Sequence, residues 1–141
     1  MITVCVAGSF DPPHRGHIQH IHAAKALGDR LVVLLNPDRD LLGKKGFIFM
    51  NWAERREILM ALRDVDEVVE ITDLDGTCAD TLAKVRPDIF AKGGDRSSDA
   101  TMPPNEVDMC RKLGIKIVYG VGGAKVQSSS ELVRAAREKA R

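Results

Sequence analysis

A predicted strand and a predicted helix meet at Gly8-Ser9-Phe10-Asp11-Pro12-Pro13-His14-Arg15-Gly16-His17. The apolar run before this stretch, residues 2–7, is typical of a buried strand, and the periodic residues 18–27 are typical of a helix. The stretch is therefore a strand-to-helix turn that carries two histidines and an arginine. In an open α/β sheet such turns lie at the carboxyl edge of the strands, where ligands bind. The N–H groups that begin the helix suit a phosphate there.

The rest of the chain repeats this alternation of strand and helix. Buried strands are predicted at residues 2–7, 30–36, 65–71, 88–92 and 115–119. Helices are predicted at residues 18–27, 52–63, 77–85, 105–113 and 128–137, and aperiodic segments predict loops at 37–50 and 97–104. This alternation, with right-handed crossovers, predicts an α/β fold with a doubly wound, five-stranded parallel sheet. The 141 residues make one domain, 1–141, without a linker or an internal repeat.

Composition limits the class of function. The chain is 44% hydrophobic and 29% charged, which is typical of a soluble globular domain. Its net charge of +1 provides no overall field that would attract nucleic acid. No run approaches the ~20 apolar residues of a membrane span, and no basic-then-apolar leader precedes the first strand. The three cysteines share no metal-ligand spacing. We therefore expect a cytoplasmic protein that binds neither nucleic acid nor membrane.

The turn resembles a known signature. Ser9-Phe10-Asp11-Pro12 followed by His14-Arg15-Gly16-His17 is similar to the G-x-F-D-x-x-H-x-G-H pattern (HxGH type) of the cytidylyltransferase-like nucleotidyltransferases. The resemblance covers essentially the whole chain. It implies a Rossmann-like nucleotidyltransferase fold with strand order 3-2-1-4-5, which would bring residues 9–17 and 92–95 into one crevice. It also implies an enzyme that moves a nucleoside monophosphate from CTP or ATP onto a phosphate and releases pyrophosphate.

The resemblance assigns roles within the turn. His14 and His17 would contact the triphosphate and the transition state, because nucleotidyl transfer depends on positioning and charge stabilisation. The predicted nucleotide-binding residues of the turn are Gly8, Ser9, Phe10, Asp11 and Gly16. Asp11 is also a candidate contact for Mg²⁺ or a phosphate-bound water. We expect Mg²⁺ as the cofactor, carried largely by the oxygens of the triphosphate rather than by the protein. His20 and His22 lie further along the helix and are expected at the surface.

Two basic segments are further candidates. In this family a basic loop after the second strand closes over the phosphates, which suggests a catalytic role for Lys44 and a weaker phosphate contact for Lys45. A solvated pair of lysines explains both residues equally well. Asn51 and Glu54 form an approximate capping pair at the start of the next helix. This segment resembles the family's Glu-Arg segment, and two roles stay open for Arg55: contact with the phosphates, or a structural tie between helices.

Two later segments complete the predicted nucleotide site. Lys92-Gly93-Gly94-Asp95-Arg96 resembles the Lys-Gly-Gly-Asp segment of ADP-heptose synthases and of glycerol-phosphate cytidylyltransferases. There Lys92 would offset phosphate charge, Gly93 would permit close approach, and Asp95 would accept hydrogen bonds from ribose or base. Gln127-Ser128-Ser129-Ser130 resembles the family's final serine-rich motif, which binds the β and γ phosphates; plain N-capping is the alternative. Lys125 stands where some relatives carry an arginine, and it is a weaker candidate contact for the substrate phosphate.

We therefore expect a nucleotidyltransferase whose partners are a nucleoside triphosphate and a phosphorylated small molecule. The Lys-Gly-Gly-Asp segment favours a sugar or polyol phosphate as the acceptor. An FMN adenylyltransferase, which makes FAD, is one alternative, and a non-catalytic nucleotide-binding module on the same fold is another. The sequence leaves the choice between CTP and ATP open. The resemblance also implies a homodimer.

Overall fold

Five parallel strands form one sheet in the computed structural model, which describes residues 1–94, 96–123 and 127–140. The strands are β1 (Thr3–Gly8), β2 (Arg30–Leu35), β3 (Glu67–Glu70), β4 (Ile89–Ala91) and β5 (Lys116–Val118). They lie in the order β3-β2-β1-β4-β5. The predicted α/β class, the parallel sheet and the strand order are therefore confirmed. The continuous apolar runs explain the agreement, because strands covered on both faces carry few polar residues.

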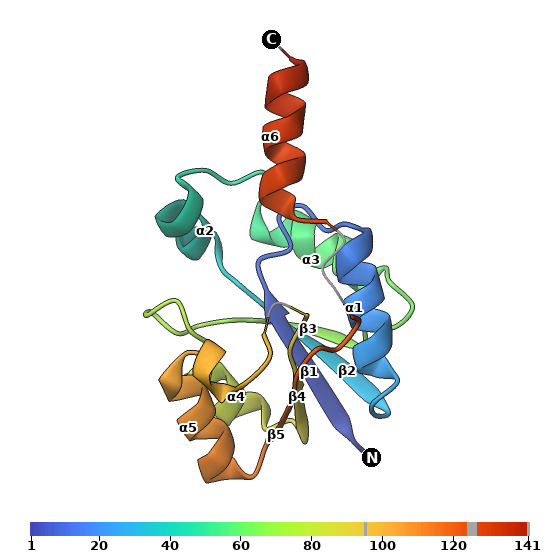
Figure 1. Ribbon diagram of the computed structural model, residues 1–141, viewed down its shortest axis with the longest axis vertical. Helices are drawn as coiled ribbons and strands as arrows, with labels where there is room; N and C mark the ends of the chain where they lie inside the picture. The colour runs from blue at the N-terminus through green and yellow to red at the C-terminus, as the bar shows by residue number, and fades with distance from the viewer. Residues whose placement is uncertain (95, 124–126, 141) are drawn as a thin grey trace.

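Helices cover both faces of this sheet. They are α1 (Arg15–Lys25), α2 (Asp38–Lys45), α3 (Trp52–Met60), α4 (Ala79–Val85), the short 3₁₀ helix η1 (Asp99–Thr101), α5 (Pro104–Leu113) and α6 (Ser129–Lys139). Figure 1 shows α1 and α3 on one side of the sheet and α4 and α5 on the other. Within the described part of the chain, no helix is both long enough and apolar enough to cross a lipid bilayer.

Alternate side chains of β2 enter two separate cores. Leu31 and Val33 pack with Ile21 of α1 on one face. Val32 packs with Leu82 of α4 on the other face. All five side chains are at most 1% exposed. The period of two along a strand thus divides the apolar residues between the two helical layers.

The predicted loop at residues 37–50 contains a helix instead, α2. Asp38 and Asp40 lie in its first turn, where carboxylates complement the helix dipole. The helix ends at Gly46, which has the left-handed φ of 77° that glycine adopts without strain. Only Leu41 is buried. The sequence therefore carries no apolar stripe from which this short helix could have been predicted.

β1 and β4 pair with each other. β1 also pairs with β2 and β4 with β5, so the direction of winding reverses between β1 and β4. In open α/β sheets, ligands bind at the carboxyl ends of the strands next to such a reversal. The turn after β1 is also joined to the end of the chain, because the Ser129 hydroxyl donates to the carbonyl oxygen of Pro12 at 2.9 Å. From this contact α6 extends away from the sheet (Figure 1).

Candidate functional site

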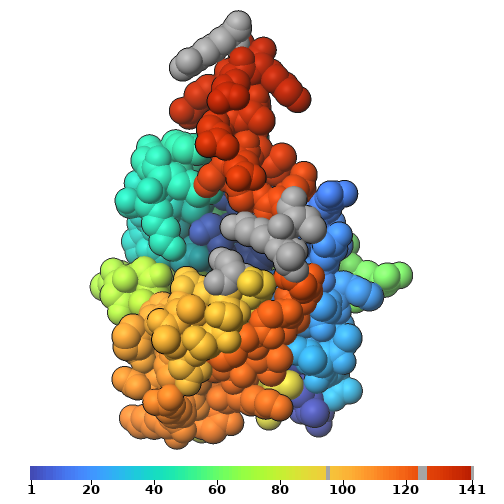
Figure 2. Space-filling model, viewed as in Figure 1, coloured from blue at the N-terminus to red at the C-terminus, as the bar shows by residue number. Residues whose placement is uncertain are grey.

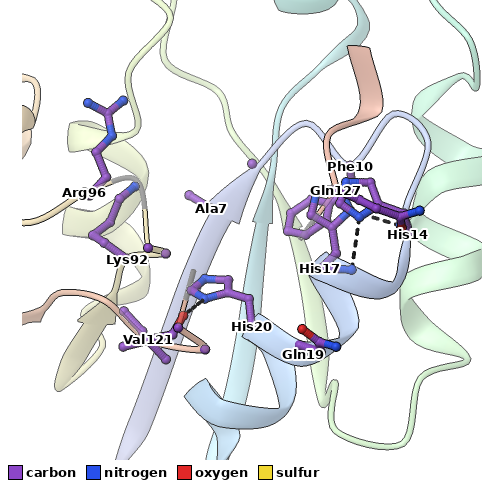
Figure 3. A pocket seen from close by; sticks show the side chains of 17 residues that line it. Ala7, Phe10, His14, His17, Gln19, His20, Lys92, Arg96, Val121 and Gln127 are labelled. Carbon is purple, nitrogen blue, oxygen red and sulfur yellow. Dashed lines mark hydrogen bonds between the residues drawn. The ribbon is translucent and has the colours of Figure 1, made fainter. Parts of the chain in front are cut away.

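A cavity of about 280 Å³ opens at the carboxyl ends of β1 and β4, between α1 and the turn after β5 (Figure 3). We call it the histidine cavity. The turn after β1 and the segment after β4 meet here, although about eighty residues separate them. The predicted site residues that line it are Gly8, Phe10, His14, Gly16, His17, Lys92, Gly93 and Gln127.

The imidazoles of His14 and His17 cap the N-terminus of α1. The backbone N–H of Gly16 donates to Nδ1 of His14 at 3.1 Å, and the backbone N–H of His14 donates to Nδ1 of His17 at 3.1 Å. Each bond satisfies an N–H group at the helix terminus that has no partner within the helix. The helix begins at Arg15, three residues before the predicted start, so His17 lies in its first turn.

These hydrogen bonds determine which nitrogen of each neutral imidazole carries the proton. Nδ1 accepts in both rings, so the proton is on Nε2, and each ring presents an N–H donor there. The two rings are stacked, with centroids 3.8 Å apart. The Phe10 ring lies 4.6 Å from that of His17. Donors held in fixed orientations are what stabilises developing negative charge without reorganisation.

His20 lines the histidine cavity, whereas sequence analysis expected it at the surface. Its Nδ1 donates to the carbonyl oxygen of Val121, in the turn after β5, at 2.8 Å (Figure 3). Gly122 makes this approach possible, because a Cβ there would lie only 2.9 Å from the Cα of His20. The glycine-rich turn and the helix were both visible in the sequence, but the contact between them was not.

The segment after β4 contributes two cations. Lys92 and Arg96 both line the histidine cavity, and Nζ of Lys92 lies 4.6 Å from the centre of the Phe90 ring. Gly93 lies between them on the wall of the cavity. The other predicted residue of this segment, Asp95, lies outside the described residues. Lys92 and Arg96 thus place positive charge opposite the imidazoles (Figure 3).

Residues of the final serine-rich segment either line the cavity or make structural hydrogen bonds. Gln127 lines the histidine cavity. Ser128 caps α6, because its hydroxyl accepts the backbone N–H of Glu131, and Ser129 binds the turn after β1 as described above. Ser130 is exposed. The remaining predicted contact in this region, Lys125, lies outside the described residues.

A second cavity, of about 500 Å³, lies on the α4 and α5 side of the end of β1. We call it the polar cavity. It shares Ala7, Gly8, Lys92 and Arg96 with the histidine cavity. Its other polar lining residues are Ser9, Asn36, Lys44, Thr77 and Glu106. Lys44 of α2 therefore lies here rather than beside the imidazoles. Figure 2 shows a hollow between the teal surface of α2 and the gold segment after β4.

Asp11 and Lys45 hold the segment that follows α2. Asp11 is fully buried, and its two carboxylate oxygens accept the backbone N–H groups of Phe49 at 2.9 Å and Met50 at 2.6 Å. Lys45 donates to the backbone oxygen of Asp11 at 3.1 Å. Because the carboxylate is buried and accepts two backbone N–H groups, the structure gives Asp11 a structural role. The contact of Asp11 with nucleotide or Mg²⁺ remains a prediction.

Arg55 holds several segments of the chain together by hydrogen bonds. Its guanidinium is fully buried. It donates to the backbone oxygens of Ser9 at 2.8 Å, Asn36 at 2.9 Å and Met50 at 2.9 Å, and to the carboxylate of Asp38 at 2.8 Å. Of the two roles left open by the sequence, the structure therefore supports the structural tie.

Residues 5–135 match the family model described as cytidylyltransferase-like. The chain belongs to this family. It is therefore an enzyme of the nucleotidyltransferase kind. This assignment agrees with the sequence resemblance, which rested on the turn that now forms one wall of the histidine cavity.

Named relatives come from two groups. A protein named FAD synthase from Pyrococcus abyssi is 37% identical over 117 residues, which cover 82% of this chain and 76% of that protein. A bifunctional protein named HldE from Methylobacillus flagellatus is 39% identical over 102 residues, or 71% of this chain. The match covers only 20% of HldE, so the chain corresponds to about a fifth of that longer protein.

Solved structures share the same architecture. The lipopolysaccharide core biosynthesis protein from Thermoplasma volcanium is 32% identical, with a TM-score of 0.70 over 90% of this chain and 99% of that one. TmcAL from Thermotoga maritima, solved with alpha-thio ATP, has a TM-score of 0.72 over 99% of this chain and 51% of that one. Its identity is 16%, so this second likeness shows the fold alone.

Proposed function

We propose that this nucleotidyltransferase transfers an adenylyl group from ATP to a sugar or polyol phosphate and releases pyrophosphate. The observation that carries the proposal is the pair of stacked imidazoles, whose Nδ1 atoms are held by the backbone so that Nε2 carries the proton. Lys92 and Arg96 supply positive charge to the same cavity. A relative named FAD synthase supports ATP over CTP as the donor, because FAD contains an adenylyl group.

In the proposed reaction an oxygen of the acceptor phosphate attacks the α-phosphorus of ATP. A new P–O bond forms there while the bond between the α-phosphorus and its bridging oxygen breaks, and pyrophosphate leaves. The Nε2–H groups of His14 and His17 would donate to oxygens on which negative charge develops. Lys92 and Arg96 line both cavities, so they would offset charge on the donor and the acceptor together.

Magnesium remains part of the proposal. The described residues hold no group of three or more His, Cys, Asp or Glu side chains that could bind a metal ion. The Asp11 carboxylate is buried and accepts two backbone N–H groups. We propose that oxygens of the triphosphate hold the ion, which would offset phosphate charge when bound. We also propose, from the family resemblance, that the enzyme is a homodimer, which sedimentation analysis would test.

FMN is the second candidate acceptor. It is favoured by the identity to a protein named FAD synthase over most of both chains. The polar cavity argues against it, because none of the described residues that line that cavity is aromatic. A flavin ring would find no stacking partner among them.

The test is pyrophosphate release with ATP or CTP, Mg²⁺ and a panel of acceptors: glycerol 3-phosphate, hexose 1-phosphates and FMN. We expect release with ATP and a sugar or polyol phosphate. Release with FMN alone would establish the second candidate. Binding of ATP, seen as a raised melting temperature, without turnover of any acceptor would favour a non-catalytic module.

A further inference from the structure

A buried carboxylate forms part of the wall of the polar cavity. Glu106 lies in the first turn of α5 and is 5% exposed. An ionised carboxylate only accepts hydrogen bonds, and burying it without partners is costly. Its presence in a cavity wall therefore calls for donors, either from the protein or from a ligand.

The protein supplies some, but not all, of the hydrogen-bond donors that the Glu106 carboxylate can accept. The backbone N–H of Cys78 donates to Oε2 of Glu106 at 3.1 Å. Among the described residues, no ion pair links Glu106 to Lys92 or Arg96, although both cations line the same cavity. Because a carboxylate has about four lone-pair positions, acceptor capacity remains.

The other polar groups of this cavity are fixed by their neighbours. Asn36 donates to Asp40 at 3.1 Å. Thr77 donates to Asp75 at 2.7 Å and accepts from Asn105 at 2.8 Å. The cavity thus combines preorganised amide and hydroxyl groups with one buried carboxylate and three cations. Cations suit a phosphate, whereas the carboxylate and the neutral groups suit hydroxyl donors.

We propose that Glu106 accepts hydrogen bonds from hydroxyl groups of the acceptor and so determines specificity for hydroxylated phosphates. The inference rests on the proposed function, in which Lys92 and Arg96 offset the charge of the acceptor phosphate. Lys44 lines the same cavity and adds a third cation. An acceptor that lacks the hydroxyl would leave the buried carboxylate without its donor. Sites built to bind a substrate hydroxyl reject such analogues strongly for this reason.

The experiment compares the parent enzyme with Glu106→Gln and Asp108→Asn. Glutamine retains a carbonyl oxygen that can accept from Cys78, so the fold should be preserved. Asp108 is exposed on the same helix and provides the matched control. Acceptors are used in pairs that differ by one hydroxyl: glycerol 3-phosphate with 1,3-propanediol monophosphate, and glucose 1-phosphate with 2-deoxyglucose 1-phosphate.

We expect Glu106→Gln to raise KM for the hydroxylated acceptor by about 10- to 100-fold, which corresponds to loss of a charge-assisted hydrogen bond. KM for ATP should not change, and the preference for the hydroxylated member of the pair should fall. Asp108→Asn should match the parent. If Glu106→Gln keeps the parental KM and the parental preference for the hydroxylated acceptor, and lowers only the melting temperature, the role of Glu106 is structural and the inference is wrong.

If the proposed function is wrong, the same experiment still tests the role of Glu106. If FMN is the acceptor turned over, the acceptor class is wrong, but the effect of Glu106→Gln on KM for FMN still tests the residue, because FMN carries a hydroxylated chain next to its phosphate. If nothing is turned over, the melting temperature decides. A stabilisation by glycerol 3-phosphate or glucose 1-phosphate that exceeds that by inorganic phosphate, and that Glu106→Gln removes, supports the inference. Equal stabilisation by inorganic phosphate overturns it.

Discussion

His14 and His17 each combine a structural bond at Nδ1 with a proposed hydrogen-bond donor at Nε2. Nδ1 of histidine is as many bonds from Cα as Oδ1 of asparagine, so His14 can cap α1 as an asparagine would. The sequence motif predicted a catalytic role for both histidines but not their capping bonds, because histidine is not among the residues that usually cap helices. Substitution by asparagine can therefore separate the two tasks.

His17→Asn is expected to reduce kcat by about 10²-fold or more while the protein stays folded, because the Nε2 donor is lost. The amide oxygen can still accept the N–H of His14, so the melting temperature should stay near that of the parent. His17→Ala should lose the same activity and also about 1 kcal/mol of stability, since the capping bond goes with it. Steady-state kinetics and urea unfolding measure the two effects. An asparagine variant with parental kcat would show that the imidazole has no catalytic part.

Arg55→Lys is expected to lower the free energy of unfolding by about 3 kcal/mol, because an ammonium cannot reach all four acceptors of the buried guanidinium. Three of those acceptors are backbone oxygens that would be left buried without donors. Urea unfolding measures the loss. The neighbouring Arg56 is exposed, so Arg56→Lys should leave stability unchanged. Equal stability of the two variants would contradict the structural role of the Arg55 hydrogen bonds.

At the scale of elements, the turn after β5 depends on one close approach. Gly122 has a φ of 92°, and a Cβ there would lie within 2.9 Å of the α1 backbone. Gly122→Ala should therefore cost about 1–3 kcal/mol and weaken ATP binding, because the turn must move from His20. Gly120→Ala is the control, since Gly120 has a φ of 65° but open space around it. Similar ATP affinity in the two variants, measured by calorimetry, would count against a role for this contact.

The helix α2 contains a glycine in its interior. Gly43 has nothing within 4 Å of the position a Cβ would take, and alanine favours the helix by about 1 kcal/mol over glycine. Gly43→Ala should raise the melting temperature. Gly46→Ala should lower it, because residue 46 ends the helix with a φ of 77°. Thermal unfolding of both variants tests whether α2 exists in solution. Opposite signs would support it, and a loss of stability in both would not.

Elements with many buried apolar residues could be predicted from the sequence, and an element with few could not. The strands were evident because their apolar runs are continuous, and the capping pair of Asn51 and Glu54 formed as expected. The helix α2 was missed because only Leu41 of it is buried. The start of α1 was placed too late because the two capping side chains are imidazoles, which no common capping rule includes.

At the scale of the whole molecule, the three cysteines lie in one core cluster, and Cys78 also lines the polar cavity. Cys5, Cys78 and Cys110 are at most 3% exposed. Burial raises the pKa of Cys110 to about 11, and burial also raises the pKa of Cys5 and Cys78. Because the thiolate is the reactive form, the native protein should resist iodoacetamide at mildly alkaline pH. Guanidinium-unfolded protein should label fully, as mass spectrometry can count. Rapid labelling of the native protein would contradict this burial.

The candidate site was predictable only in part. Local motifs identified His14, His17 and Lys92, which the fold brings to one cavity. Glu106 and His20 were missed because their burial depends on packing between elements distant in sequence. Asp11 was assigned to the ligand because its motif position was visible, whereas the N–H groups that occupy it lie 38 and 39 residues further on.

The bond between Ser129 and Pro12 has a consequence for biosynthesis. It joins positions 117 residues apart, and the contact of His20 with Val121 spans 101 residues. A ribosome releases residue 12 long before residue 129, so the turn after β1 must wait for α6 to be made. Nucleotide cannot help a growing chain to complete this site until residue 129 has emerged.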